Sequence, residues 1–213
     1  MARLNGRIAG VLFLVASAQF ILGLVITEAL YPNYSVADNY VSDLGVGPSS
    51  LVFNSSAFLL GVLSLVGAYF LPRTVDFRSL TVLLVLMAIG AMGVGVFTSG
   101  FSTTIHGAVS LMAFGFGALS AIVSFRVLKM PLSAISVILG VMTLGALALF
   151  AAGLVTTGSL NSNVPPSSEF FLGLGPGGME HMIVYPAGIW LILFSGHLIT
   201  LSEKQEKPEI SVR

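Results

Sequence analysis

Six long apolar runs divide the chain, and shorter polar segments separate them. The runs cover residues 8–30, 51–71, 80–98, 106–128, 132–156 and 178–201. Each has the length of about 20 residues that a helix needs to cross a hydrocarbon core of roughly 30 Å. A helix also satisfies its own backbone hydrogen bonds in lipid, which an open strand cannot do. The pattern predicts an all-α, polytopic membrane protein with a bundle of six transmembrane helices.

The basic residues occur only in alternate connections of this predicted bundle. They lie before the first run, between the second and third, between the fourth and fifth, and after the sixth: Arg3, Arg7, Arg73, Arg78, Arg126, Lys129, Lys204, Lys207 and Arg213. Basic loops stay in the cytoplasm during insertion. We therefore expect a multi-pass protein of the cell membrane with both termini cytoplasmic and with residues 202–213 as a cytoplasmic tail.

Two of the outer connections are longer than the cytoplasmic links. The first contains Ser35 and Asp38, which form a helix-start pattern, and Gly45, which is placed to end a helix. We expect a short amphipathic helix over residues 36–44 that lies along the outer membrane surface. The second, residues 157–177, is rich in Gly, Ser and Pro. That composition predicts a flexible segment, which is either a lid or a plain connector.

Composition supports one membrane domain over residues 1–213. Charged residues form 8% and hydrophobic residues 55% of the chain, whereas about 25% of an ordinary soluble domain is charged. Because cysteine is absent, disulfides and thiolate metal sites are excluded. The formal net charge of zero argues against nucleic-acid binding, so membrane lipids are the expected partners. The many glycines within the runs are assigned to close packing of helices.

Polar residues gather at the outer ends of the predicted helices, and they are the candidates for chemistry. The candidate catalytic residues are Asp38, Asp43, His106, Glu180, His181 and Tyr185. Carboxylates and imidazoles at one depth can form a general acid and base pair or hold a divalent metal such as zinc. The expected metal ligands are His106, His181 and Asp43. At about 100° per residue, His181 and Tyr185 share one helix face and Glu180 lies at its flank.

A structural role for the same residues is an open alternative. Asp38 also fits the carboxylate at a helix start, and Glu28 and Glu169 are expected to be solvated acids at the interface. A hydrogen-bond network that holds the outer helix to the bundle would use the other candidates. No two histidines lie one helical turn apart, as they do in many metal motifs.

Three segments of the chain resemble a known family. They are NYVSDLG at 39–45 followed by FNSS at 53–56, His106 at the start of the fourth helix, and GMEHMIVYP at 178–186 followed by Trp190. Together they resemble the prokaryotic six-span membrane family of unknown function DUF 998 over nearly the whole chain.

One further likeness is shorter, and another group of membrane enzymes offers an analogy. The SDLG segment resembles the outer-loop signature of the eukaryotic damage-regulated autophagy modulator family, whose wider group is linked to lipid-anchor remodelling and autophagy. The ceramidase and progestin-receptor-like membrane hydrolases arrange Ser, Asp and several His around zinc. This chain lacks the pair of histidines at one-turn spacing that closes their site.

The sequence leaves three functions open. An outward-facing cleft that contains Asp43, His106, Glu180 and His181 would suit a hydrolase or transferase acting on a lipid or lipid-linked substrate. The same acidic vestibule would suit a protein that binds or transports a small solute or cation. A structural accessory protein would need no ligand, and its polar residues would then serve stability alone.

Overall fold

Six long helices form most of the chain in the computed structural model, which describes residues 2–73, 75, 77–157 and 169–204. They are α1 (Ala2–Leu30), α2 (Ser50–Phe70), α3 (Arg78–Val96), α4 (Thr103–Val123), α5 (Leu132–Thr157) and α6 (Gly175–Lys204). Four short 3-10 helices lie in the connections: η1 (Val41–Gly45), η2 (Leu71–Arg73), η3 (Ser124–Arg126) and η4 (Glu169–Phe171). The described residues contain no strand. The predicted all-α bundle is confirmed.

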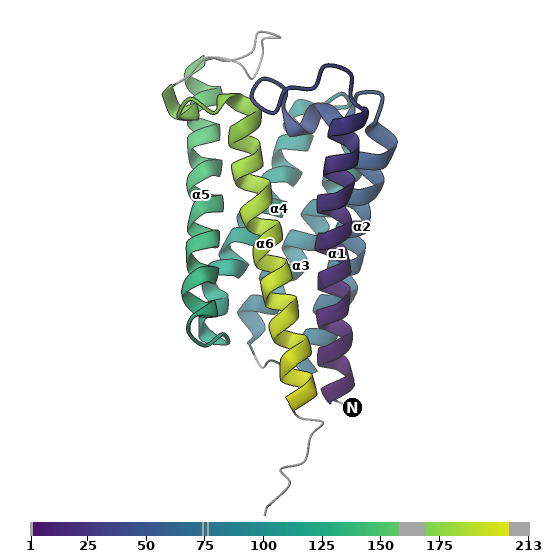
Figure 1. Cartoon of the computed structure of the whole chain (residues 1–213), viewed down its shortest axis with the longest axis vertical. Helices are drawn as coiled ribbons and strands as arrows, with labels where there is room; N and C mark the ends of the chain where they lie inside the picture. Colours follow the sequence, from purple (N-terminus) through teal and green to yellow (C-terminus); the bar gives the residue numbers. More distant parts are fainter. Residues whose placement is uncertain (1, 74, 76, 158–168, 205–213) are drawn as a thin grey trace, which may run out of the picture.

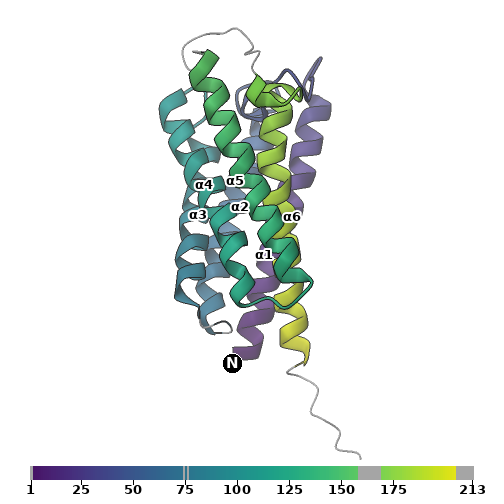
Figure 2. The same ribbon diagram turned by 90° about the vertical axis from the view of Figure 1, so that its left-hand side faces the viewer.

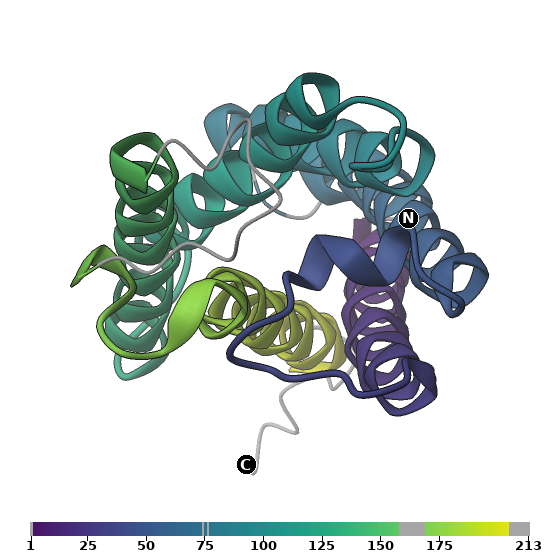
Figure 3. The same ribbon diagram turned by 90° about the horizontal axis from the view of Figure 1, so that it is seen from above.

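The helices stand alternately up and down (Figures 1 and 2) and form a closed ring in sequence order, as the view from above shows (Figure 3). Each helix packs against the next one, and α6 closes the ring against α1. We call the end near the N-terminus the lower end, and the end that carries the α1–α2 connection the upper end. Seen from the upper end, the α1–α2 connection crosses the opening of the ring (Figure 3).

All six helices are long and apolar enough to cross a membrane, judged by length and composition. Their outer surfaces carry large apolar side chains, including Leu22 at 62%, Val82 at 54% and Leu111 at 59% exposure. So much exposed apolar surface suits contact with lipid and is rare on soluble proteins. The chain is a membrane protein.

The helices extend beyond some of the predicted runs. Helix α1 begins at Ala2 rather than at residue 8, and α6 covers Gly175–Lys204 rather than residues 178–201. An apolar run marks only the part of a helix that lies in hydrocarbon, whereas the helix itself continues into the polar interface. Helix α4 is shorter than its run, because the chain changes to the 3-10 helix η3 at Ser124.

The expected outer helix is present in a shorter form than residues 36–44. Ser35 Oγ donates a hydrogen bond to Asp38 Oδ2 at 2.7 Å, and the carbonyl of Ser35 accepts one from the Asn39 amide, so these residues form a separate turn. Tyr40 is extended, and the 3-10 helix η1 begins directly after it. The side chains of Val41 and Leu44 are buried in the upper core.

The start of α6 packs tightly against that turn. Gly177 N donates to Ala37 O at 3.1 Å, and a Cβ on Gly177 would lie 2.0 Å from Asn39 O. Gly175 has a φ of +73°, a conformation that favours glycine. The end of the predicted flexible segment is therefore ordered, with η4 and the first turn of α6. The rest of the predicted lid, residues 158–168, lies outside the described residues.

A buried network joins three helices at the lower end. Ser136 Oγ of α5 donates to Ala121 O of α4 at 2.6 Å and lies 2.5 Å from Ser124 Oγ. Trp190 Nε1 of α6 donates to Ser124 Oγ at 3.2 Å. The network fixes the indole of Trp190, which is 0% exposed, inside the ring.

We predict that Gly177→Ala destabilises the protein by about 1–3 kcal/mol, because the added methyl group meets backbone atoms that cannot move independently. Thermal unfolding in detergent measures the change. Gly196→Ala, on the same helix, is the matched control because a Cβ there meets nothing within 4 Å. An equal loss of stability in both variants would contradict the proposed close contact.

Candidate functional site

Glu180 joins α6 to the 3-10 helix at the upper end of the ring. Its Oε2 accepts hydrogen bonds from the amides of Val41 at 2.5 Å and Ser42 at 3.3 Å. The first amides of a helix have no partner within the helix, so a carboxylate placed there satisfies them. Glu180 was expected at the flank of the helix face that His181 and Tyr185 share, and in the structure its carboxylate positions η1.

Asp43 also serves the start of η1. Its Oδ2 accepts a hydrogen bond from the Tyr40 amide at 2.9 Å. Burial raises the pKa of the Asp43 carboxyl, and this hydrogen bond opposes the rise. Burial likewise raises the pKa of the Tyr40 hydroxyl to about 12, with smaller contributions from the charges of Glu180 and Asp43. The hydrogen bond of Asp43 stabilises the fold of the connection.

His106 lies in the first turns of α4 and is 9% exposed. Its Nδ1 lies 2.7 Å from the carbonyl oxygen of Phe97 at the end of α3. A carbonyl can only accept, so Nδ1 carries the proton and the neutral ring keeps a lone pair on Nε2. Nε2 has no hydrogen-bond partner among the described residues.

His181 faces α1 and pairs with Glu28. Its Nδ1 lies 2.7 Å from Gly177 O, and its Nε2 lies 2.7 Å from Glu28 Oε1. Because Nδ1 donates to a carbonyl, the second contact needs one more proton, either on the imidazole or on the carboxyl group. The pair is neutral overall in both cases. Glu28 was expected to be solvated, and that expectation is wrong. Tyr185 packs its ring on His181 at a centroid distance of 5.5 Å.

The predicted metal ligands are not brought together. His106 contacts α3, His181 contacts α1, and Asp43 contacts its own 3-10 helix. Asp38 is exposed, and within the described part of the chain its side chain pairs only with Ser35. Among the described residues, no three His, Asp or Glu side chains are placed to hold a metal ion. The geometry does not support the expected zinc site.

A chamber lies beneath η1 and contains two of the candidates. His106 and Glu180 line it together with Ser42 and Ser110, and the remaining walls are apolar. The empty space at this site, including its open mouth, is about 510 Å³. Asp43, His181 and Tyr185 do not line it. The structure therefore brings two of the six predicted residues to one cavity.

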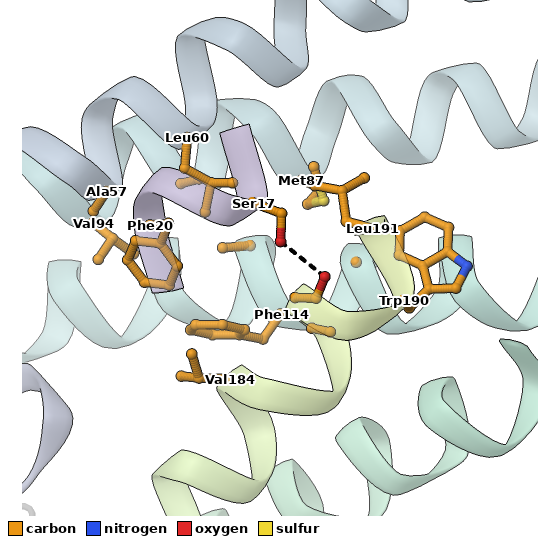
Figure 4. A pocket seen from close by; sticks show the side chains of 15 residues that line it. Ser17, Phe20, Ala57, Leu60, Met87, Val94, Phe114, Val184, Trp190 and Leu191 are labelled. Carbon is orange, nitrogen blue, oxygen red and sulfur yellow. Dashed lines mark hydrogen bonds between the residues drawn. The ribbon is translucent and has the colours of Figure 1, made fainter. Parts of the chain in front are cut away.

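A second chamber lies deeper in the ring and has almost wholly apolar walls. Its empty space, including space open to the outside, is about 580 Å³. Phe20, Phe114 and Val184 lie at one end of it and Trp190 at the other (Figure 4). The hydroxyl of Ser17 donates to Gly188 O at 2.8 Å, so it is already satisfied. This chamber suits an apolar group.

The two chambers are adjacent. Four residues line both of them: Phe20, Val94, Phe114 and Val184. Ten residues of α6 separate Glu180 in the upper chamber from Trp190 in the lower one, a rise of about 15 Å along the helix. The two chambers therefore lie one above the other, with the polar groups in the upper one.

Comparison with known proteins identifies a family. Residues 14–197 match the family described as "Protein of unknown function (DUF998)". The chain belongs to the DUF998 family. The predicted resemblance is thereby confirmed. The chain matches no curated protein and no solved structure. The likeness to the damage-regulated autophagy modulators stays a prediction.

Sequence reasoning missed the lower chamber of this DUF998 protein. Alanines and glycines from α2, α3, α4 and α6 line it, including Ala91, Ala113 and Gly117. Gly117 had been assigned to close helix packing, as Gly90 is, where a Cβ would lie 2.4 Å from Ala113 N. A Cβ on Gly117 would meet nothing nearer than Met87 at 3.5 Å. A glycine that packs against a neighbouring helix and a glycine that lines a cavity look the same in the sequence. Only the rotation of each helix about its axis distinguishes them.

We predict that Glu28 and His181 of the DUF998 protein are energetically coupled. Glu28→Ala and His181→Ala should each destabilise the fold, because each leaves a partly buried polar group unpaired. The double variant should lose less than the sum, by about 0.5–3 kcal/mol. Thermal unfolding of the four proteins in detergent measures the coupling. Strictly additive losses would show that the two side chains do not interact.

Proposed function

We propose that this DUF998 protein binds a single-chain amphiphile of the membrane inside its helix ring. The polar head would lie in the upper chamber beside Glu180 and His106, and the alkyl chain would extend toward Trp190. The observation that carries the proposal is the adjacency of a partly polar and an apolar chamber, through residues that line both.

The charge distribution supports one orientation for this site. Every Lys and Arg that the structure describes lies toward the lower end, in α1, the α2–α3 and α4–α5 segments or the end of α6. By the positive-inside rule the lower end, with the start of α1 and the end of α6, lies in the cytoplasm. In a cell membrane the head-group chamber would then open toward the outer side.

A hydrolase or transferase that acts on a lipid is the second candidate. The observation that favours it is the tautomer of His106, whose Nε2 is free to act as a general base. This function needs the same chambers, so binding is its first requirement. It predicts turnover of a bound ester that His106→Gln abolishes while binding is retained.

Trp190 is the only tryptophan of the chain and lines the lower chamber, so its fluorescence reports occupancy directly. We predict that a long-chain alcohol brominated near its tail quenches Trp190 when added to the protein in lipid nanodiscs. The same alcohol brominated beside its head should quench far less, because its bromine would lie about 15 Å higher.

Two variants on α4 separate this binding from quenching by the surrounding lipid. Gly117→Leu should abolish the quenching, because the new side chain fills the lower chamber. Gly115→Leu places the same side chain outside the chambers, where a Cβ meets only Leu111 at 3.8 Å. The Gly115→Leu variant should bind the alcohol as the unmodified protein does. Equal quenching in all three proteins would contradict the proposal.

A further inference from the structure

We infer that the head group of the bound amphiphile is an ammonium, which makes the ligand a long-chain primary amine. The inference rests on the proposed function and adds the chemical class of the ligand. It is carried by the polar atoms that line the upper chamber and by the charges around them.

The chamber offers hydrogen-bond acceptors. Glu180 uses Oε2 for the amides of η1, and its other carboxyl oxygen has no partner among the described residues. The buried imidazole of His106 donates through Nδ1 to Phe97 O, so it presents only the lone pair of Nε2. The hydroxyls of Ser42 and Ser110 also line the chamber, and each can donate or accept. Together with two unpartnered groups that accept, they favour a ligand that donates. An ammonium brings three N–H donors and no acceptor.

The charges around the chamber exclude an anionic head. Among the described residues no Lys or Arg lies near the upper end, and His181 is already paired with Glu28. The other ionisable groups near Glu180 are Asp43, Tyr40 and Tyr34, none of which carries a positive charge. A carboxylate or phosphate head would face these groups with no cation to offset the repulsion. An ammonium supplies the positive partner that Glu180 lacks.

A simple cation does not fit the site as well. The described residues provide no group of three ligands for a metal ion. A small cation would also leave the apolar chamber beneath it empty, and an empty apolar cavity costs stability. An amine with an alkyl chain would place its donors in the upper chamber and fill the lower chamber with its chain.

The test compares three amphiphiles with the same chain and the same bromine near the tail. They differ only in the head, which is a primary amine, a hydroxyl or a carboxylic acid. Quenching of Trp190 is titrated at neutral pH in nanodiscs of zwitterionic lipid, with Gly117→Leu as the baseline for partition into the bilayer. The amine should bind at least about tenfold more tightly than the acid, because a charge-assisted hydrogen bond is gained and a repulsion is avoided.

Variants of the two acceptors test the assignment. Glu180→Gln keeps a side-chain oxygen for the Val41 amide but removes the charge, so amine affinity should fall about tenfold while alcohol affinity stays the same. Asp38→Asn is the matched control, since Asp38 is an exposed acid at the same end. It should leave amine affinity unchanged. His106→Leu removes the second acceptor and should weaken the amine and the alcohol alike.

The outcomes separate the inference from the proposed function. If the acid binds as tightly as the amine, or if the amine preference survives Glu180→Gln, the ammonium assignment is overturned while binding in the chambers stands. If Asp38→Asn lowers amine affinity as much as Glu180→Gln does, general surface charge explains the preference and the assignment also fails. If none of the three amphiphiles quenches Trp190, the proposed function itself is overturned.

Discussion

The carboxylate of Glu180 accepts hydrogen bonds from the first amides of η1. This contact holds the α1–α2 connection across the upper end of the ring. A ring of six helices leaves an opening that only a segment with satisfied backbone groups can cover near the membrane. The connection meets this constraint with a carboxylate from α6 and another from Asp43. Its apolar side chains Val41 and Leu44 then face inward. The upper chamber exists because the α1–α2 connection is held in place above it.

The ring depends equally on how α6 closes against α1. Contacts occur at three levels: Glu28 with His181 near the top, Ser17 with Gly188 in the middle, and Gly10 against α6 near the bottom. Small residues elsewhere bring helices together where a neighbour fills the space, as at Gly90. Inside the ring they leave space unfilled. Because such space is costly when empty, the lower chamber would be stabilised by an apolar occupant.

The number and order of the helices could be predicted, because in lipid an apolar run of about 20 residues has few alternatives to a helix. The depth of the polar residues follows from the same runs. The contact partners of these polar residues do not follow from the runs. Helices that are apolar on all sides carry no sequence pattern that sets their rotation, so packing decides which residues meet. For this reason Glu28 pairs with His181 against expectation, and Glu180 rather than His181 shares a chamber with His106.

The polar atoms that line the upper chamber also bear on the choice between binding and hydrolysis. Hydrolysis of an ester develops negative charge on an oxygen, which needs preorganised donors beside it. In the upper chamber the amides of Val41 and Ser42 are already committed to Glu180. Among the described lining residues, only the hydroxyls of Ser42 and Ser110 are available as donors, against the acceptors of Glu180 and His106. A site rich in acceptors stabilises a donating or cationic head better than an oxyanion. The geometry therefore favours binding over acyl transfer.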